Sequence, residues 1–136
     1  MSWENVELKD INPLPELIPE GRYTFQLLGA ELDQRDPSRL VVRTAIVTDG
    51  DFQGRRLIVD YPDPERYDWS LKALKRLEIA IGVDQAPGET VVGFLNRAVN
   101  SRFQGTVYHD RSYTPEGETE PRVRARLRHF SVQPSA

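Results

Sequence analysis

A run of seven residues constrains the fold of this chain most: residues 122–128 read Arg-Val-Arg-Ala-Arg-Leu-Arg. Successive side chains of a β-strand point to opposite faces, so this period of two predicts a strand. Val123, Ala125 and Leu127 would enter a core, while the arginines would form a row on the other face, about 6.6 Å apart. The run therefore predicts one apolar face and one cationic face, and the cationic face suits an extended polyanion.

The composition fits a single cytoplasmic domain without a cofactor. The chain has 136 residues, which is enough for one real core. It has no cysteine and two histidines, which excludes disulfides and thiolate metal sites. No stretch reads as a signal peptide or is apolar enough to span a bilayer, so we expect a cytoplasmic protein with no membrane partner.

Charge is unevenly distributed along the chain. The net charge is −3, which argues against a generally basic nucleic-acid binder. Residues 1–40 hold eight acidic and four basic side chains, whereas residues 97–136 hold seven basic and four acidic ones. Because the local field steers a charged ligand, the C-terminal part is the expected place for an anionic partner.

The N-terminal part predicts an arm followed by three strands. Residues 1–19 are acidic and rich in proline, which breaks backbone ladders, so we expect an arm there and the folded domain over 20–136. Trp3, Leu14, Leu17 and Ile18 could dock this arm on the domain. Strands are expected from Gly21 to Leu32, over Leu40–Thr48 with Arg43 facing outward, and over Arg55–Tyr61. The apolar phase slips at Gly29, which predicts a β-bulge.

The second half predicts helices and two further strands. Leu71, Leu74, Leu77 and Ile81 follow helical spacing, with Asp68 or Ser70 as the cap and Gly82 after the end. A shorter helix is expected over Thr90–Val99. A strand over Phe103–His109 and a long polar loop over 109–121 lead to the arginine strand, where a phase slip near His129 predicts a second bulge.

Three strands, a helix and two strands is the order of an OB-fold, a five-stranded Greek-key barrel with a helix between strands three and four. The motifs lie at residues 21–25 (GRYTF), 29–32 (GAEL), 52–56 (FQGRR), 71–77 (LKALKRL), 81–83 (IGV) and 130–132 (FSV). Over residues 20–133 the chain resembles phage and prophage single-stranded-DNA-binding proteins with this all-β fold.

The resemblance implies single-stranded DNA as the ligand, and phage or host replication and recombination proteins as further partners. Residues 133–136, QPSA, depart from the family in lacking an acidic tail that would recruit such partners. The sequence leaves the oligomeric state open.

Single-strand binders combine a cationic groove with aromatic rings on which bases stack. The candidate nucleic-acid-binding residues are Arg43, Arg55, Arg56, Tyr61, Tyr108, Arg111, Tyr113, Arg122, Arg124, Arg126 and Arg128. OB-folds usually bind on strands two and three and the loops after strands one and four, which favours the loop-proximal Arg122 and Arg124.

Each candidate has a simpler interpretation. Tyr23, Phe25, Phe103 and Phe130 lie in phase with apolar residues and are expected in the core, while Tyr61 fits either burial or contact. The arginine row could be a solvated face paired with acidic neighbours. Trp69 fits a packing role that anchors its helix to the barrel better than it fits a contact with DNA.

Two other functional classes remain open. Asp60, Asp63, Glu65 and Asp68 could bind Mg²⁺ as nuclease carboxylates do, although the prolines among them favour a turn and a helix start. No phosphate-binding glycine loop or nucleophile–base pair is present in the sequence, so we expect a protein that is not an enzyme. The alternative is a protein-interaction module or a phage structural or regulatory barrel, for which the N-terminal arm would bind a partner.

Overall fold

The predicted order of strands and helices is present in the structure, a computed structural model that describes residues 3–5, 7–9, 17–114, 116–117, 119 and 122–132. The side chains of Trp3, Tyr113 and Arg122 lie outside this part. The elements are η1 (Trp3–Asn5), β1 (Gly21–Leu32), β2 (Leu40–Ile46), β3 (Arg56–Tyr61), α1 (Trp69–Ile81), α2 (Val91–Arg97), β4 (Arg102–Tyr113) and β5 (Arg122–Val132).

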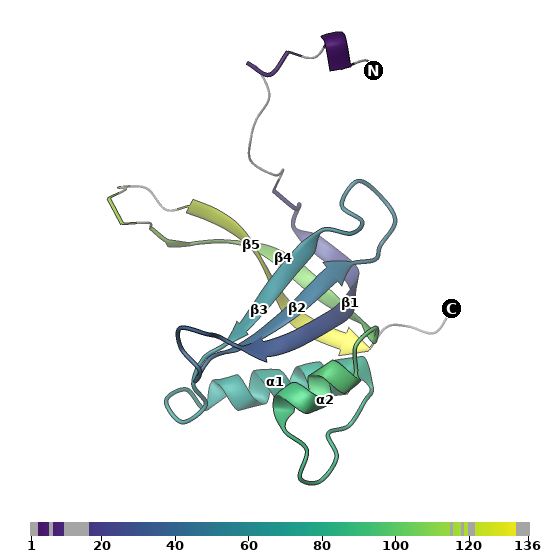
Figure 1. The fold of residues 1–136 in the computed structure, drawn as a ribbon, viewed down its shortest axis with the longest axis vertical. Helices are drawn as coiled ribbons and strands as arrows, with labels where there is room; N and C mark the ends of the chain where they lie inside the picture. The colour runs from purple at the N-terminus through teal and green to yellow at the C-terminus, as the bar shows by residue number, and fades with distance from the viewer. Residues whose placement is uncertain are drawn as a thin grey trace.

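The strands form one five-stranded antiparallel sheet in the order β3-β2-β1-β4-β5. β4 returns through the two helices to lie beside β1, which is the strand order of a Greek key. α1 contacts β3, β4 and β5, and α2 contacts β1, so both helices cover one end of the curled sheet (Figure 1). β3 and β5 also contact each other, but among the described residues no ladder joins them. The sheet is therefore open along this seam.

Both predicted bulges are confirmed. The β1–β2 register shifts between Leu27 and Gly29, and the amide of Asn96 on α2 bonds both backbone groups of Ala30 just beyond it. In β5 the register shifts opposite Gly105, where His129 adopts a φ of 56°. α2 thus fastens the first bulge, and the second bulge turns β5 where its apolar phase slips.

The core lies between the concave face of the sheet and the helices. Phe25 and Phe103 are fully buried and stack with ring centroids 5.8 Å apart. Phe130 meets Phe103 edge-on at 5.4 Å, and Tyr23 packs against the same cluster, so the expected core aromatics are confirmed. The arginine strand contributes Leu127, which is 8 % exposed, whereas Val123 is exposed, contrary to the predicted inward position.

The long predicted helix is confirmed as α1, but its ends differ in detail. Gly82 follows it with a φ of 71°, the left-handed conformation in which glycine ends a helix. Asp68 occupies the N-cap position without a side-chain capping bond, and the Ser70 hydroxyl instead donates to the Pro62 carbonyl at 2.8 Å. Leu77 is buried but Leu71 is 57 % exposed, so the apolar face begins one turn later than its spacing predicts.

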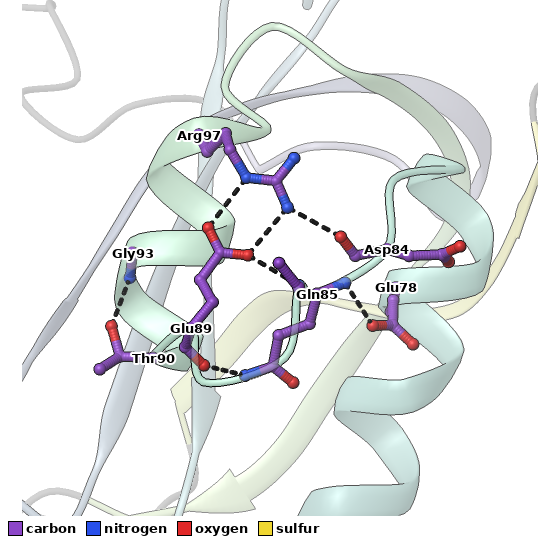
Figure 2. A network of polar contacts seen from close by, with 8 residues as sticks. Glu78, Asp84, Gln85, Glu89, Thr90, Gly93 and Arg97 are labelled. Atoms are coloured by element: carbon purple, nitrogen blue, oxygen red, sulfur yellow. Dashed lines mark hydrogen bonds and ion pairs between the residues drawn. The ribbon is translucent and has the colours of Figure 1, made fainter.

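α2 is shorter than the predicted Thr90–Val99, and a polar network joins it to the connection that follows α1. Thr90 caps it by accepting from the Gly93 amide at 3.0 Å. Arg97 donates to both carboxylate oxygens of Glu89, at 2.9 and 2.8 Å, and to the Asp84 carbonyl at 2.7 Å (Figure 2). The Gln85 amide group donates to the Glu89 carbonyl, so the α1–α2 connection is held by defined bonds.

The loop between the last two strands is shorter than predicted. β4 continues past His109 to Tyr113 and pairs with β5 as far as Arg122, so Tyr113 belongs to a strand and not to a loop tip. This β4–β5 hairpin extends beyond the body of the sheet (Figure 1). The pairing of residues 109 and 110 with Ala125 and Arg124 extends the ladder through a stretch whose polar composition predicted a loop.

Among the described residues of the arm, Ile18 enters the core and is 2 % exposed. The imidazole of His109 lies 2.8 Å from the Ile18 carbonyl, and the His109 amide donates to Glu20 at 3.0 Å. The proposed docking of Leu14 and of the Trp3 ring lies outside the described residues. Within the described part of the chain, no helix has the length and apolarity to cross a bilayer.

Candidate nucleic-acid interface

A groove of about 580 Å³ follows the open seam between β3 and β5, with α1 on one side. Its lining combines cations and rings that come from separate elements. The polar and aromatic members are Asp60 and Tyr61 from β3, Trp69 and Arg76 from α1, Tyr108 from β4, and Arg126, Arg128, His129 and Phe130 from β5. Among the described residues, no backbone ladder joins β3 to β5, so the side chains of the two strands line the seam.

Tyr108 and Arg128 form the closest cation–ring pair in the groove. The guanidinium carbon of Arg128 lies 4.1 Å from the centroid of the Tyr108 ring. Tyr108 pairs with Arg126 in the β4–β5 register, and both project from the outward face because Val107 and Leu127 are buried. A planar cation over a ring offers one stacked surface and several donors at its edge.

Arg126 and Arg124 share the carboxylate of Asp110 on β4. Oδ2 of Asp110 lies 3.2 Å from Nη1 of Arg126 and 3.6 Å from Nη2 of Arg124. Hydrogen bonds from the Ser112 hydroxyl and amide, together with the bond and charge of Arg126, hold the pKa of Asp110 at about 2. The carboxylate is therefore ionised at neutral pH, and part of the arginine row is already paired.

Two groove residues on α1 are not among the binding residues predicted from the sequence. Arg76 is absent from that prediction, and Trp69 is expected there to pack rather than to contact DNA. Trp69 is 51 % exposed and lines the groove, whereas its position favoured a packing role that anchors the helix. Its ring lies 6.2 Å from that of Tyr67, over which Arg66 is placed at 5.4 Å. Residues seven apart lie on the same helical face, so the spacing of Trp69 and Arg76 is a signal that could have found both.

Four of the other predicted arginines do not line this groove. Arg43 faces outward as expected and pairs with Glu31 of β1. Arg55 lies over Phe52 at 5.8 Å, Arg56 is exposed at the start of β3, and Arg111 is exposed on β4. The side chains of Tyr113 and Arg122 are outside the described part, so the structure places only their backbones.

Tyr61 is buried, with 3 % of its surface exposed. Within the described part of the chain its hydroxyl has no hydrogen-bond partner, and burial raises the pKa of this phenol. A ring face covered in this way offers no platform for a base. Of the two interpretations that the sequence left open for Tyr61, burial is the one the structure supports.

The carboxylates near the end of β3 form a turn. Asp63 accepts from the Glu65 amide at 3.0 Å, and the Arg66 and Tyr67 amides donate to the Asp63 carbonyl. Among residues that the structure describes, no three histidines, cysteines or carboxylates are grouped so that they could hold a metal ion.

A second hollow, of about 270 Å³, lies beside the starts of both helices. Its lining is mostly apolar and includes Leu32 and Leu71, which are 50 % and 57 % exposed. It differs from the groove in having no arginine or lysine in its lining.

In comparisons with known proteins, no protein-family model and no curated protein matches this chain.

Proposed function

We propose that this protein binds single-stranded DNA with little base specificity and without catalysing a reaction, in the groove between β3 and β5. One observation carries the proposal: arginines, the exposed ring of Trp69 and the half-buried ring of Tyr108 line the same open groove. The groove-facing set is Trp69, Arg76, Tyr108, Arg126 and Arg128.

The chemistry of these side chains fits a single strand. Guanidinium groups donate two parallel hydrogen bonds to a phosphate, which accounts for affinity without reading sequence. A base stacked on an aromatic ring contributes about 1–3 kcal/mol, and every base has a face that can stack. Trp69 and Tyr108 would take bases, while the three groove arginines would take phosphates.

The topology supports an OB-fold as the scaffold of this site. The open antiparallel sheet, the Greek-key order of its strands and the helices between β3 and β4 are features of that fold. OB-folds bind oligonucleotides on strands two and three and on neighbouring loops. The groove adjoins β3, so it lies at the edge of this usual surface and extends it toward α1 and β5.

The resemblance to phage single-stranded-DNA-binding proteins supports a role in phage-type replication or recombination in the cytoplasm. Such a protein would cover single strands and meet replication or recombination enzymes there.

The direct test is fluorescence anisotropy of a labelled oligo-dT titrated with the purified protein. We expect binding at low salt that weakens steeply as salt rises, because phosphate contacts release counterions. The slope of log K against log salt for a single strand is about −0.7 per phosphate contact. Absence of binding at tens of micromolar protein in low salt would rule out the proposal.

A protein-interaction role is the second candidate, and the apolar hollow beside Leu32 and Leu71 favours it. An interface built from apolar side chains depends little on ionic strength. The salt titration therefore separates the two functions, because only the nucleic-acid site predicts a steep loss of affinity.

A further inference from the structure

Two arginines of β5, one of which lines the groove, converge on one carboxylate. Asp110 lies opposite Arg124 in the β4–β5 register, and its Oδ2 is within 3.2 Å of Arg126 and 3.6 Å of Arg124. Its Oδ1 accepts from the amide and the hydroxyl of Ser112, at 2.8 and 2.6 Å. Both carboxylate oxygens are therefore occupied, and the side chain is fixed in place.

The exposure of the three side chains shows which groups a ligand can reach. The Asp110 side chain is 12 % exposed, whereas those of Arg124 and Arg126 are 46 % and 42 % exposed. The carboxylate is thus more buried than the two arginine side chains that bind it. An approaching anion would meet the arginines first and the aspartate directly behind them.

We infer that Asp110 is an internal competitor of the phosphate backbone, which orients Arg124 and Arg126 and limits how tightly they hold DNA. This role rests on the proposed function. Carboxylate and phosphate oxygens accept from the same guanidinium donors, so a phosphate either displaces Asp110 or binds beside a like charge. Both cases weaken the complex and favour reversible, sequence-independent binding.

Asp110 keeps its negative charge over the pH range in which a nucleic acid would bind. The Ser112 bonds, and then Arg126, hold the pKa of Asp110 at about 2, so the carboxylate is ionised throughout the neutral range. Arg124 and Arg126 thereby act with one unit of positive charge less than two free guanidinium groups would carry.

The test compares oligo-dT binding by the wild type and by Asp110→Asn, a variant of nearly the same shape. Removing the competing charge should tighten binding at low salt by about fivefold, as expected for an exposed ion pair. It should also steepen the salt slope by about 0.7, the contribution of one more effective cation. Asp110→Ala should give the same direction, which keeps the test available if one variant fails to fold.

Glu31→Gln is the matched control, because it removes a carboxylate from another cross-strand arginine pair, with Arg43, outside the groove. An equal gain in this control would overturn the inference, since the effect would then follow net charge. Unchanged or weaker binding by both folded Asp110 variants, with normal wild-type binding, overturns the competitor role alone. No binding by any of the proteins at low salt overturns the proposed function as well.

Discussion

Arg126 and Arg128 are two residues apart on β5, yet their surroundings differ. Arg126 pairs with Asp110, and the guanidinium of Arg128 lies over the Tyr108 ring. Both line the groove, whereas the sequence favoured the loop-proximal Arg122 and Arg124. The second bulge turns β5 at His129, directly after Arg128. This turn lies next to the part of the arginine row that lines the groove.

Replacing Arg126 and Arg128 together by alanine should weaken oligo-dT binding and flatten its salt slope by about 1.4, which corresponds to two lost phosphate contacts. The measurement is anisotropy at several salt concentrations. Arg43→Ala is the matched control, because Arg43 is also an outward strand arginine with an acidic partner but lies outside the groove. Equal flattening by the control would place the binding face elsewhere.

Among the elements, the α1–α2 connection is joined to the end of α2 by the carboxylate of Glu89. Glu89 accepts from Arg97 through both oxygens, and one of these also accepts from the Ala86 amide at 2.9 Å. The bonds from Arg97, followed by that from Ala86, lower the pKa of Glu89 from 4.5 to about 2. The connection is therefore held by an ionised carboxylate. Protonation of Glu89 would remove its charge-assisted bonds with Arg97.

The stabilisation from Glu89 should depend on pH in one direction. Because the folded-state pKa is depressed, the contribution is complete above the unfolded value of 4.5 and is lost as pH falls toward about 2. Thermal unfolding followed by circular dichroism should give a lower Tm for Glu89→Gln than for the wild type at neutral pH. The gap should close as the pH approaches 2; a gap that stays constant would show that the carboxylate charge is not the cause.

For the whole molecule, the groove exists because α1, β3 and the β4–β5 hairpin meet at an unclosed seam. α1 brings Trp69 and Arg76 to an edge that β3, β4 and β5 form from distant positions in the sequence. Trp69 is half exposed beside this edge, so it should report on any ligand that enters.

A Trp3→Phe variant leaves Trp69 as the one tryptophan, since the chain has two. Its fluorescence should be quenched when oligo-dT is added, because a base stacked on indole quenches it, and salt should reverse the change. Trp69→Ala should weaken binding by about 1–3 kcal/mol. Tyr67→Ala is the control, because Tyr67 is exposed nearby but does not line the groove. An unquenched Trp69 at saturating oligo-dT would place the strand away from α1.

Local patterns in the sequence determined the elements. The alternation in residues 122–128, the helical spacing up to Ile81 and the phase slips at Gly29 and His129 predicted strands, a helix and bulges that the structure confirms. These features depend on backbone geometry over a few residues, so neighbours in the sequence suffice to specify them.

Only the tertiary structure decided which side chains share a surface. It buried Tyr61, exposed Trp69, extended β4 through Tyr113 and set Asp110 between two arginines. Each outcome depends on contacts between residues far apart in the chain, where the period of a single strand or helix carries no information. The sequence by itself determined that one strand would carry a row of arginines, and the packing of α1 against the β3–β5 seam decided which of them border the groove.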